Sequence, residues 1–185
     1  MTAPTSQAPA PAEIAVFHPE RLVAILGRFK VQYVFIGGIA ARLQGFPWLT
    51  ALAEITPAID PANFETLATA LKHLGARIYT AGTPAGLPFE VSADALARAE
   101  RWQFATSCGR VDVAFRPAGT KGYAELRARA VRLKLHGDAI AVASLDDLVR
   151  MKQAPDAVTS AHELAVLMEV ALRQQHSQTA VHFAE

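Results

Sequence analysis

Cysteine, long apolar runs and signal-like segments are scarce or absent in this sequence. Cys108 is the only cysteine, so neither a disulfide framework nor a cysteine metal site can form within the chain. No apolar run reaches the roughly 18 to 20 residues that a membrane span needs. Residues 1–13 lack the basic start and apolar middle of a signal peptide. These absences predict a cytoplasmic protein that does not associate with membranes.

An excess of charge of either sign is also missing. The chain has 18 Lys and Arg against 17 Asp and Glu, which gives a formal net charge of +1. This balance argues against a protein whose main role is to bind nucleic acid through its phosphates, although a local basic patch is compatible with it. The six histidines include no pair at the i, i+4 spacing of a helical metal site.

The length of 185 residues suits one domain with a substantial core. Residues 1–13 are rich in Ala, Pro, Thr and Ser, which predicts a disordered tail. We expect a single domain over 14–175 and a frayed C-terminal tail over 176–185. The oligomeric state is left open.

Hydrophobic spacing predicts alternating helices and strands. The predicted helices are Pro19–Phe29, Ile39–Leu43, Pro61–Leu74, Ser92–Trp102, Lys121–Ala130, Ser144–Met151 and Ala161–Leu172. The predicted strands are Gln32–Ile36, Leu52–Thr56, Arg77–Thr80, Gln103–Ser107, Arg110–Phe115, Val131–Leu135 and Ala139–Val142. Ala81–Pro88 holds two glycines and two prolines and is predicted to be a loop. Hairpins mixed with helices between strands indicate an α/β or α+β fold with a mixed sheet.

The most informative segment is Tyr33–Pro57, in which a buried strand runs into Gly37-Gly38 and a short helix follows. Glycines let the backbone approach a ligand closely, and free amides at a helix start can bind a phosphate. The simpler alternative is that the two glycines only permit a tight turn.

This segment resembles the nucleotidyltransferase superfamily, particularly small bacterial proteins related to the toxins of toxin–antitoxin systems. In that family a Gly-Gly or Gly-Ser turn precedes a strand that carries two aspartates one residue apart. The resemblance continues in Asn63–Ala76 (the following helix), Gly109–Pro117 (the strand with the third carboxylate) and Ala143–Lys152 (the closing helix). It covers Phe29–Lys152 and implies a mixed β-sheet flanked by helices.

The resemblance also implies a site. Residues i and i+2 of a strand share a face, so two carboxylates can bind one Mg²⁺ ion, and a third from a neighbouring strand completes the set. In this chain Glu54 and Asp112 match two of these positions as catalytic and metal-binding residues, with Asp112 also placed to act as a base. An NTP would be bound by Gly37, Gly38, Arg42, Thr50 and Lys152.

The sequence departs from the family pattern at two places. Leu52 stands where the first aspartate is expected and offers no oxygen, and Glu54 is one methylene longer than the second. The stretch Gln153–His162 lacks the basic element of the family's Lys-Asp turn, unless Lys152 supplies it. Mg²⁺ demands near-ideal geometry, so both its binding and catalysis are expected to be weakened.

Three hypotheses follow. The first is a catalytically impaired nucleotidyltransferase-fold protein, a pseudoenzyme that binds a nucleotide or a protein partner; the resemblance implies a toxin–antitoxin setting for it. The second is an active enzyme that moves a nucleotide from an NTP to an RNA, protein or small-molecule hydroxyl. The third is an interaction module without a ligand, with the Ala-rich final helix as a candidate dimer face.

Four side chains allow both a functional and a structural interpretation. Trp48 and Trp102 could stack on a nucleobase or serve as lining and core residues. Arg42 could reach a phosphate or remain solvated. Cys108 could be a nucleophile, but it lies in a strand-like run without a nearby histidine, so a buried thiol is expected.

Overall fold

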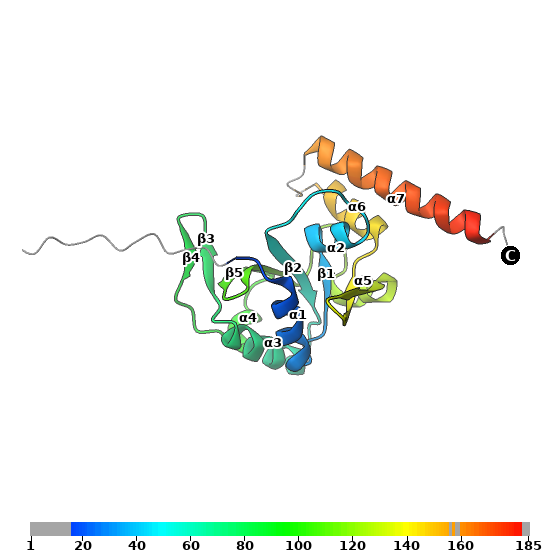
Figure 1. Cartoon of the computed structure of the whole chain (residues 1–185). Coiled ribbons are helices and arrows are strands. Elements are labelled where there is room, and N and C mark those ends of the chain that lie inside the picture. Colours follow the sequence, from blue (N-terminus) through cyan, green and yellow to red (C-terminus); the bar gives the residue numbers. More distant parts are fainter. Residues whose placement is uncertain (1–15, 156, 158–159, 183–185) are drawn as a thin grey trace, which may run out of the picture.

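The computed structural model describes residues 16–155, 157 and 160–182, with side chains described as far as 175. The predicted disordered tail over 1–13 lies outside these residues. The described chain forms a mixed β-sheet with helices packed around it (Figure 1), which confirms the predicted fold class. No helix among the described residues combines the length and the apolar character that crossing a membrane requires.

The elements alternate along the chain as follows. The helices are α1 (Pro19–Arg28), α2 (Gly37–Leu43), α3 (Pro61–His73), α4 (Ala93–Leu96), α5 (Tyr123–Arg129), α6 (Leu145–Gln153) and α7 (Ala161–His182). The strands are β1 (Tyr33–Ile36), β2 (Leu52–Pro57), β3 (Arg77–Thr80), β4 (Thr83–Leu87), β5 (Arg101–Thr106), β6 (Gly109–Ala114), β7 (Val131–Leu135) and β8 (Asp138–Val142).

The strands form one sheet in the order β4-β3-β5-β6-β2-β1-β8-β7. Only β2–β6 and β1–β8 are parallel pairs; the other neighbours are antiparallel. The predicted hairpins β5–β6 and β7–β8 are both present. Two strands that are far apart in sequence, β2 and β6, therefore lie side by side at the centre of the sheet.

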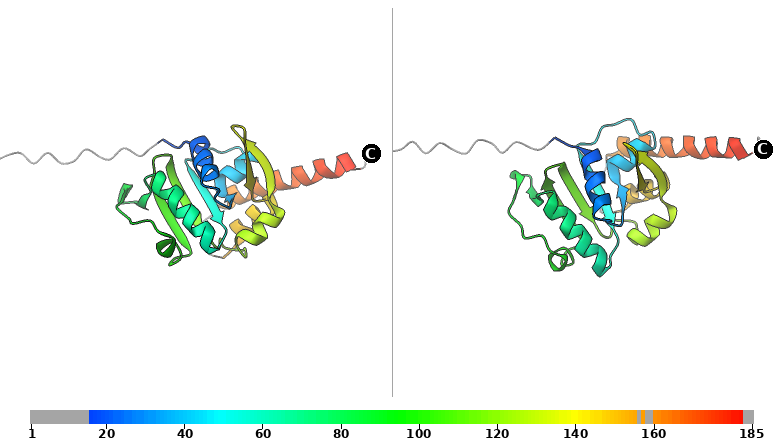
Figure 2. Two further views of the ribbon diagram at one scale, coloured as in Figure 1. Left: turned by 90° about the horizontal axis from the view of Figure 1, so that it is seen from below. Right: turned by 60° about the horizontal axis from the view of Figure 1, so that its bottom comes forward.

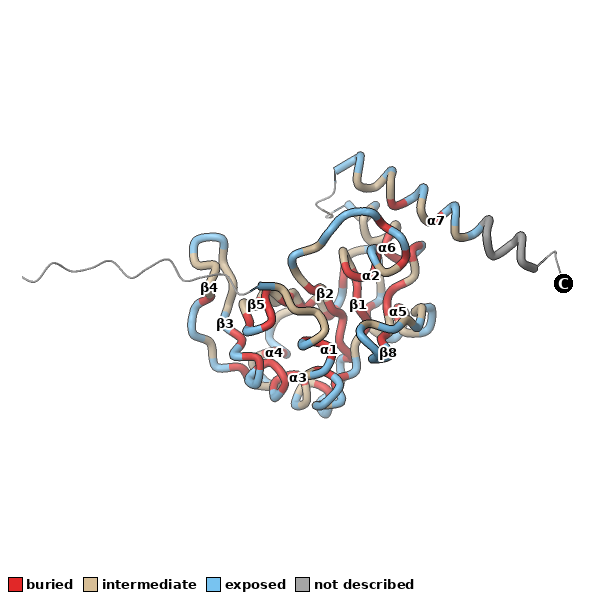
Figure 3. The backbone as a smooth tube through the Cα atoms, viewed as in Figure 1, coloured by how far each residue is buried: buried red, intermediate tan, exposed pale blue. Residues whose placement is uncertain are grey.

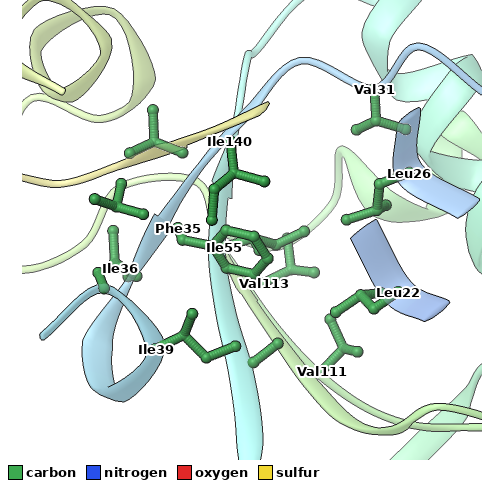
Figure 4. Close-up of a cluster of buried hydrophobic side chains, with 14 of the residues drawn as sticks. Leu22, Leu26, Val31, Phe35, Ile36, Ile39, Ile55, Val111, Val113 and Ile140 are labelled. Carbon is green, nitrogen blue, oxygen red and sulfur yellow. The ribbon is translucent and has the colours of Figure 1, made fainter. Parts of the chain in front are cut away.

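The core fills the face of the sheet on which α1 packs (Figure 4). Alternate residues of the central strands, such as Ile55 of β2 with Val111 and Val113 of β6, are fully buried together with Leu22 of α1. Figure 2 shows α1 and α3 next to each other across this face. Because strand side chains alternate between faces, the residues between these positions point to the opposite side of the sheet.

Asn63 ties the start of α3 to the entry of β1. Its Oδ1 accepts a hydrogen bond from the Gln32 backbone N–H at 2.7 Å, and its Nδ2 donates to the carbonyl oxygens of Gln32 and Ala58 at 3.0 and 2.9 Å. Asp60 caps the same helix by accepting from the Asn63 backbone N–H. The buried side-chain amide of Asn63 is thus fully hydrogen-bonded where the segment after β2 returns across the sheet.

A network of ion pairs holds α6 against α5. Arg129 and Arg150 each form ion pairs with both Asp147 and Glu125. The pKa of Glu125 is lowered to about 2, and the hydrogen bond from Arg150 contributes most to this shift. Ser144 caps α6 by accepting from the Asp147 backbone N–H. The position of α6 matters because this helix forms one wall of the cleft described below.

The predicted loop Ala81–Pro88 is wrong. Residues Thr83–Leu87 form β4, which pairs antiparallel with β3. Proline cannot donate a ladder hydrogen bond, but β4 is the edge strand of the sheet, where Pro84 costs little. Gly86 has a φ of +81°, and the register shifts along this pair, so the strand is irregular.

The predicted helix from Ser92 to Trp102 is also largely wrong. Ser92 does cap a helix, but α4 ends at Leu96 and β5 begins at Arg101. Trp102 lies in β5, and its indole N–H donates to the Leu96 carbonyl at 3.0 Å. Pairing of β5 with β6 over its whole length outweighs the local helical spacing.

The final helix is longer than predicted. Helix α7 runs from Ala161 to His182, whereas the sequence placed its end at Leu172. The frayed tail expected over 176–185 stays a prediction, and residues 183–185 lie outside the described part. The helix extends away from the rest of the domain (Figure 1), and most of its described side chains are exposed or half-buried (Figure 3). Helix α2 begins at Gly37 itself, two residues before the predicted start.

Candidate functional site

Four side chains, two from each strand, lie on the outer face of β2 and β6. The parallel register places Glu54 directly across from Asp112, and Leu52 across from Arg110. All four are half-buried, while the residues between them face the core. The predicted juxtaposition of positions 52, 54 and 112 on one sheet face is therefore present in the structure.

A cleft of about 250 Å³ lies in front of Glu54 and Asp112. Its walls come from the end of β1 with Gly37, from Arg101 of β5, from the segment after β6, and from α6. The lining residues are Ile36, Gly37, Glu54, Arg101, Asp112, Val113, Ala114, Pro117, Ala118, Leu148, Met151, Lys152 and Ala157. This volume is just below the roughly 300–1,000 Å³ of small-molecule pockets, so the cleft can enclose part of a nucleotide.

Asp112 is fully engaged by neighbouring side chains. Arg110 Nε donates to Asp112 Oδ1 and Arg110 Nη2 to Oδ2, both at 2.7 Å. Gln103 lies across from Asp112 on β5, and its Nε2 donates to Oδ2 at 3.1 Å. A bidentate guanidinium–carboxylate pair of this kind is strong and directional. Both oxygens of Asp112 are thus already hydrogen-bonded.

The carboxylate of Glu54 points into the glycine turn. Its Oε2 accepts a long hydrogen bond, 3.4 Å, from the Gly38 backbone N–H. Burial, and then the charge of Asp112, raise the pKa of Glu54, and Lys152, Gly38 and Arg101 act against this rise. The amide that was expected to bind a phosphate therefore faces a carboxylate of the same chain.

Gly37 is required at this turn for two reasons. Its φ is +61°, a left-handed conformation that side chains disfavour. A Cβ atom added here would also lie 1.6 Å from Glu54 Oε2. Gly38 is constrained as well, because its Cβ would lie 2.8 Å from the Thr50 side chain. The Gly-Gly pair makes room for Glu54 and Thr50.

The remaining predicted nucleotide-binding residues do not all meet at the cleft. Lys152 lines it and pairs with Glu163 of α7 at 2.8 Å. Arg42 and Thr50 instead line a separate apolar pocket with Phe17 and Leu49. Thr50 Oγ1 donates to the Leu52 carbonyl at 3.0 Å, which shapes the start of β2.

The two tryptophans pack against other aromatic rings, and Cys108 is buried. Trp102 stacks on Phe104, and Trp48 makes edge contact with Phe46 next to His162 of α7. Neither tryptophan lines the cleft. Cys108 is buried, as predicted, and burial raises the pKa of its thiol.

Sequence reasoning missed Arg101, Gln103 and Arg110. Arg110 lies two residues before Asp112, so strand alternation alone puts both on one face. That signal was present in the sequence. Gln103 already lay in a predicted strand, and its place beside Asp112 follows from the β5–β6 register. Arg101 was concealed by the predicted helix through Trp102.

The side chains at this site do not fit a magnesium ion. Leu52 has no oxygen, both oxygens of Asp112 bind other groups, and Glu54 is turned into the glycine bend. Among the described residues, no group of three or more His, Cys, Asp and Glu side chains is placed to hold a metal. Mg²⁺ needs several hard oxygen ligands in near-octahedral geometry, which this arrangement does not supply.

No protein-family model matches the sequence, and no curated protein matches it. Solved structures do resemble the fold. The lincomycin-bound lincosamide antibiotic adenylyltransferase LnuA matches with a TM-score of 0.53 and 13% identity, over 84% of this chain and 99% of that chain.

Two further structures match less closely. They are the antibiotic-resistance factor ANT(2'')-Ia (TM-score 0.49, 9% identity, 90% of this chain and 94% of that one) and a Thermotoga maritima protein assigned as a nucleotidyltransferase (TM-score 0.45, 14% identity, 92% and 96%). The mixed sheet and its flanking helices thus form a nucleotidyltransferase-type fold, which the match to LnuA carries.

The fit of Glu54 into the glycine turn predicts the outcome of Gly37→Ala. Gly75 is a matched control, because its φ is +62° and a Cβ there meets nothing within 4 Å. Gly75→Ala should cost about 1 kcal/mol from backbone strain, and Gly37→Ala about 2 kcal/mol more from the collision. Chemical denaturation measures both. In a Glu54→Ala background the extra cost should largely vanish; if it persists, Glu54 does not occupy the turn.

The raised pKa of Glu54 predicts how stability depends on pH. The pKa of Glu54 is higher in the folded state than in the unfolded state. The contribution of Glu54 to the free energy of unfolding is therefore complete below the unfolded-state pKa and is lost as pH rises through the folded-state pKa. Glu54→Gln should therefore gain stability relative to the native chain between pH 4 and pH 8 in urea titrations. Glu65→Gln, on the exposed side of α3, controls for loss of one charge. A constant difference across this range would contradict the burial argument.

Proposed function

We propose that this protein binds a nucleoside triphosphate in the cleft between β2, β6 and α6, and that its capacity for metal-dependent nucleotidyl transfer is impaired or absent. The observation that carries the proposal is the register of β2 and β6. It sets Glu54 beside Asp112 at the floor of a cleft, in a fold of nucleotidyltransferase type, with a leucine at the third position of that face.

The charges around the cleft support binding of a phosphate chain. Arg101 and Lys152 line it together with Glu54 and Asp112, and Arg110 offsets the charge of Asp112. A raised pKa makes Glu54 easier to neutralise when an anion approaches. Cationic side chains would thus supply the attraction that a metal ion provides in metal-dependent sites.

Similarity to LnuA makes an adenine nucleotide the first ligand to test, since that protein is named an adenylyltransferase. The incomplete acid set argues against transfer, because positioning and charge supply nearly all of the catalysis in phosphoryl chemistry. A toxin–antitoxin setting and a protein partner remain part of the hypothesis drawn from the sequence resemblance.

An interaction module is the second candidate, and one observation favours it. Met168 and Leu172 on α7 are 40% and 52% exposed, although both are large apolar side chains. They lie on the helix that extends away from the domain (Figure 1). In this reading α7 contacts another protein and the cleft has no ligand.

Calorimetry with the four NTPs, each in EDTA and in Mg²⁺, separates these functions. We expect at least one NTP to bind, with Lys152→Ala and Arg101→Ala each weakening it by about tenfold, because each removes a charge-assisted contact. Arg132→Ala, on the exposed side of β7, is the matched control and should bind normally.

The same samples are then incubated with labelled NTP and candidate acceptors. Binding without incorporation supports the proposal. Incorporation of label would instead establish an active transferase, and absence of any binding would favour the interaction module.

A further inference from the structure

Arg110 occupies an unusual position for a cation at this fold's acidic centre. It projects from the same strand face as Asp112, and its guanidinium contacts both Asp112 oxygens at 2.7 Å. The guanidinium also lies over the ring of Tyr79 on β3, with Cζ 4.3 Å from the ring centroid. The pKa of Arg110 is raised, mainly by its hydrogen bonds to Asp112, so its guanidinium stays positively charged at any working pH.

The register adds a second observation. Leu52, the position at which the family resemblance leads one to expect an acid, lies directly across from Arg110. Paired residues on adjacent strands are about 5 Å apart. An aspartate at position 52 would therefore share a sheet face with Glu54 and Asp112, whereas the Arg110 guanidinium extends away from it, toward Tyr79 of β3. On this face, Leu52 thus stands in place of one acid, and a second acid, Asp112, is held in an ion pair with Arg110.

We propose that Arg110 is a built-in replacement for a divalent cation: it neutralises Asp112 permanently, and together with Leu52 it excludes metal ions from the cleft. The inference deepens the proposed function, since it makes nucleotide binding independent of metal.

The physical basis is competition for the same oxygens. A planar guanidinium satisfies a carboxylate bidentately and needs no other ligand, whereas Mg²⁺ must give up water for several oxygens at fixed angles. Gln103 takes a further lone pair of Asp112. Tyr79 stabilises the guanidinium through its ring face. A metal ion would have to displace Arg110 and would gain only Asp112 and Glu54.

This arrangement predicts that the two substitutions depend on each other. In Leu52→Asp alone, Asp112 would still be paired with Arg110, so only two of the three carboxylates could bind a metal ion. In Arg110→Met alone, Asp112 and Glu54 remain without a third ligand. Only Leu52→Asp with Arg110→Met leaves three carboxylates on one face with Asp112 released from its ion pair.

The test is titration of Mn²⁺ alone, followed by electron paramagnetic resonance, on the full chain and these variants. The native chain and Leu52→Asp should bind Mn²⁺ only in the millimolar range. The double variant should bind at least about tenfold more tightly, because groups that hold a ligating carboxylate change metal affinity by roughly 10- to 100-fold. Leu52→Asp with Arg101→Met is the matched control: it removes a cation that lines the cleft without freeing Asp112, and should gain little.

Three results would overturn the proposal: tight Mn²⁺ binding by the native chain, equal binding by Leu52→Asp and the double variant, or no gain in a folded double variant. Circular dichroism checks folding. If the double variant does not fold, Leu52→Asp with Arg110→Gln takes its place, since the amide can keep one hydrogen bond to Asp112 without the charge. The Mn²⁺ titration contains no nucleotide, so a failure of the proposed nucleotide binding leaves this result interpretable.

Discussion

The parallel pairing of β2 with β6 is the constraint on which the rest of the site depends. These strands are separated by α3, β3, β4, α4 and β5, and their register alone brings Glu54 beside Asp112 and Leu52 beside Arg110. The core secures that register: Ile55, Val111 and Val113 are fully buried beneath it. A slip of one residue would send the charged side chains into the core and the aliphatic ones into the cleft, which burial strongly opposes.

On this framework the charges compensate one another within the chain. Asp112 is paired with Arg110, while Glu54 is partly buried beside it and has a raised pKa. The glycine turn, which could face an incoming anion, receives Glu54 instead, and Gly37 provides the space for it. The cleft is consequently close to electrostatic balance without any bound ion. That balance distinguishes it physically from a site assembled around a metal.

Much of the fold could be predicted from the sequence, because its strongest signals are local. The predicted strand Arg110–Phe115 and the predicted helix start at Pro61 correspond closely to β6 and α3. The predictions that failed concern elements whose structure depends on contacts between residues far apart in the sequence. Pro84 argued against a strand that its edge position tolerates, and the helical spacing before Trp102 was outweighed by pairing between β5 and β6. Glu54 and Asp112 were placed correctly on one face. Of the partners of Asp112, Arg110 is two residues away on the same strand, and Gln103 follows from the β5–β6 register. The separation of Arg42 and Thr50 from the cleft depends on packing around α2.

The central claim is that this cleft receives a nucleotide without a metal ion. Amide ¹H–¹⁵N NMR during titration with ATP in EDTA tests it most directly. The expected result is a set of shifts centred on Gly37, Asp112 and Lys152, which all line the cleft, and little further change when Mg²⁺ is added in excess of EDTA. Shifts that arise only with Mg²⁺, or that cluster away from these residues, would contradict it.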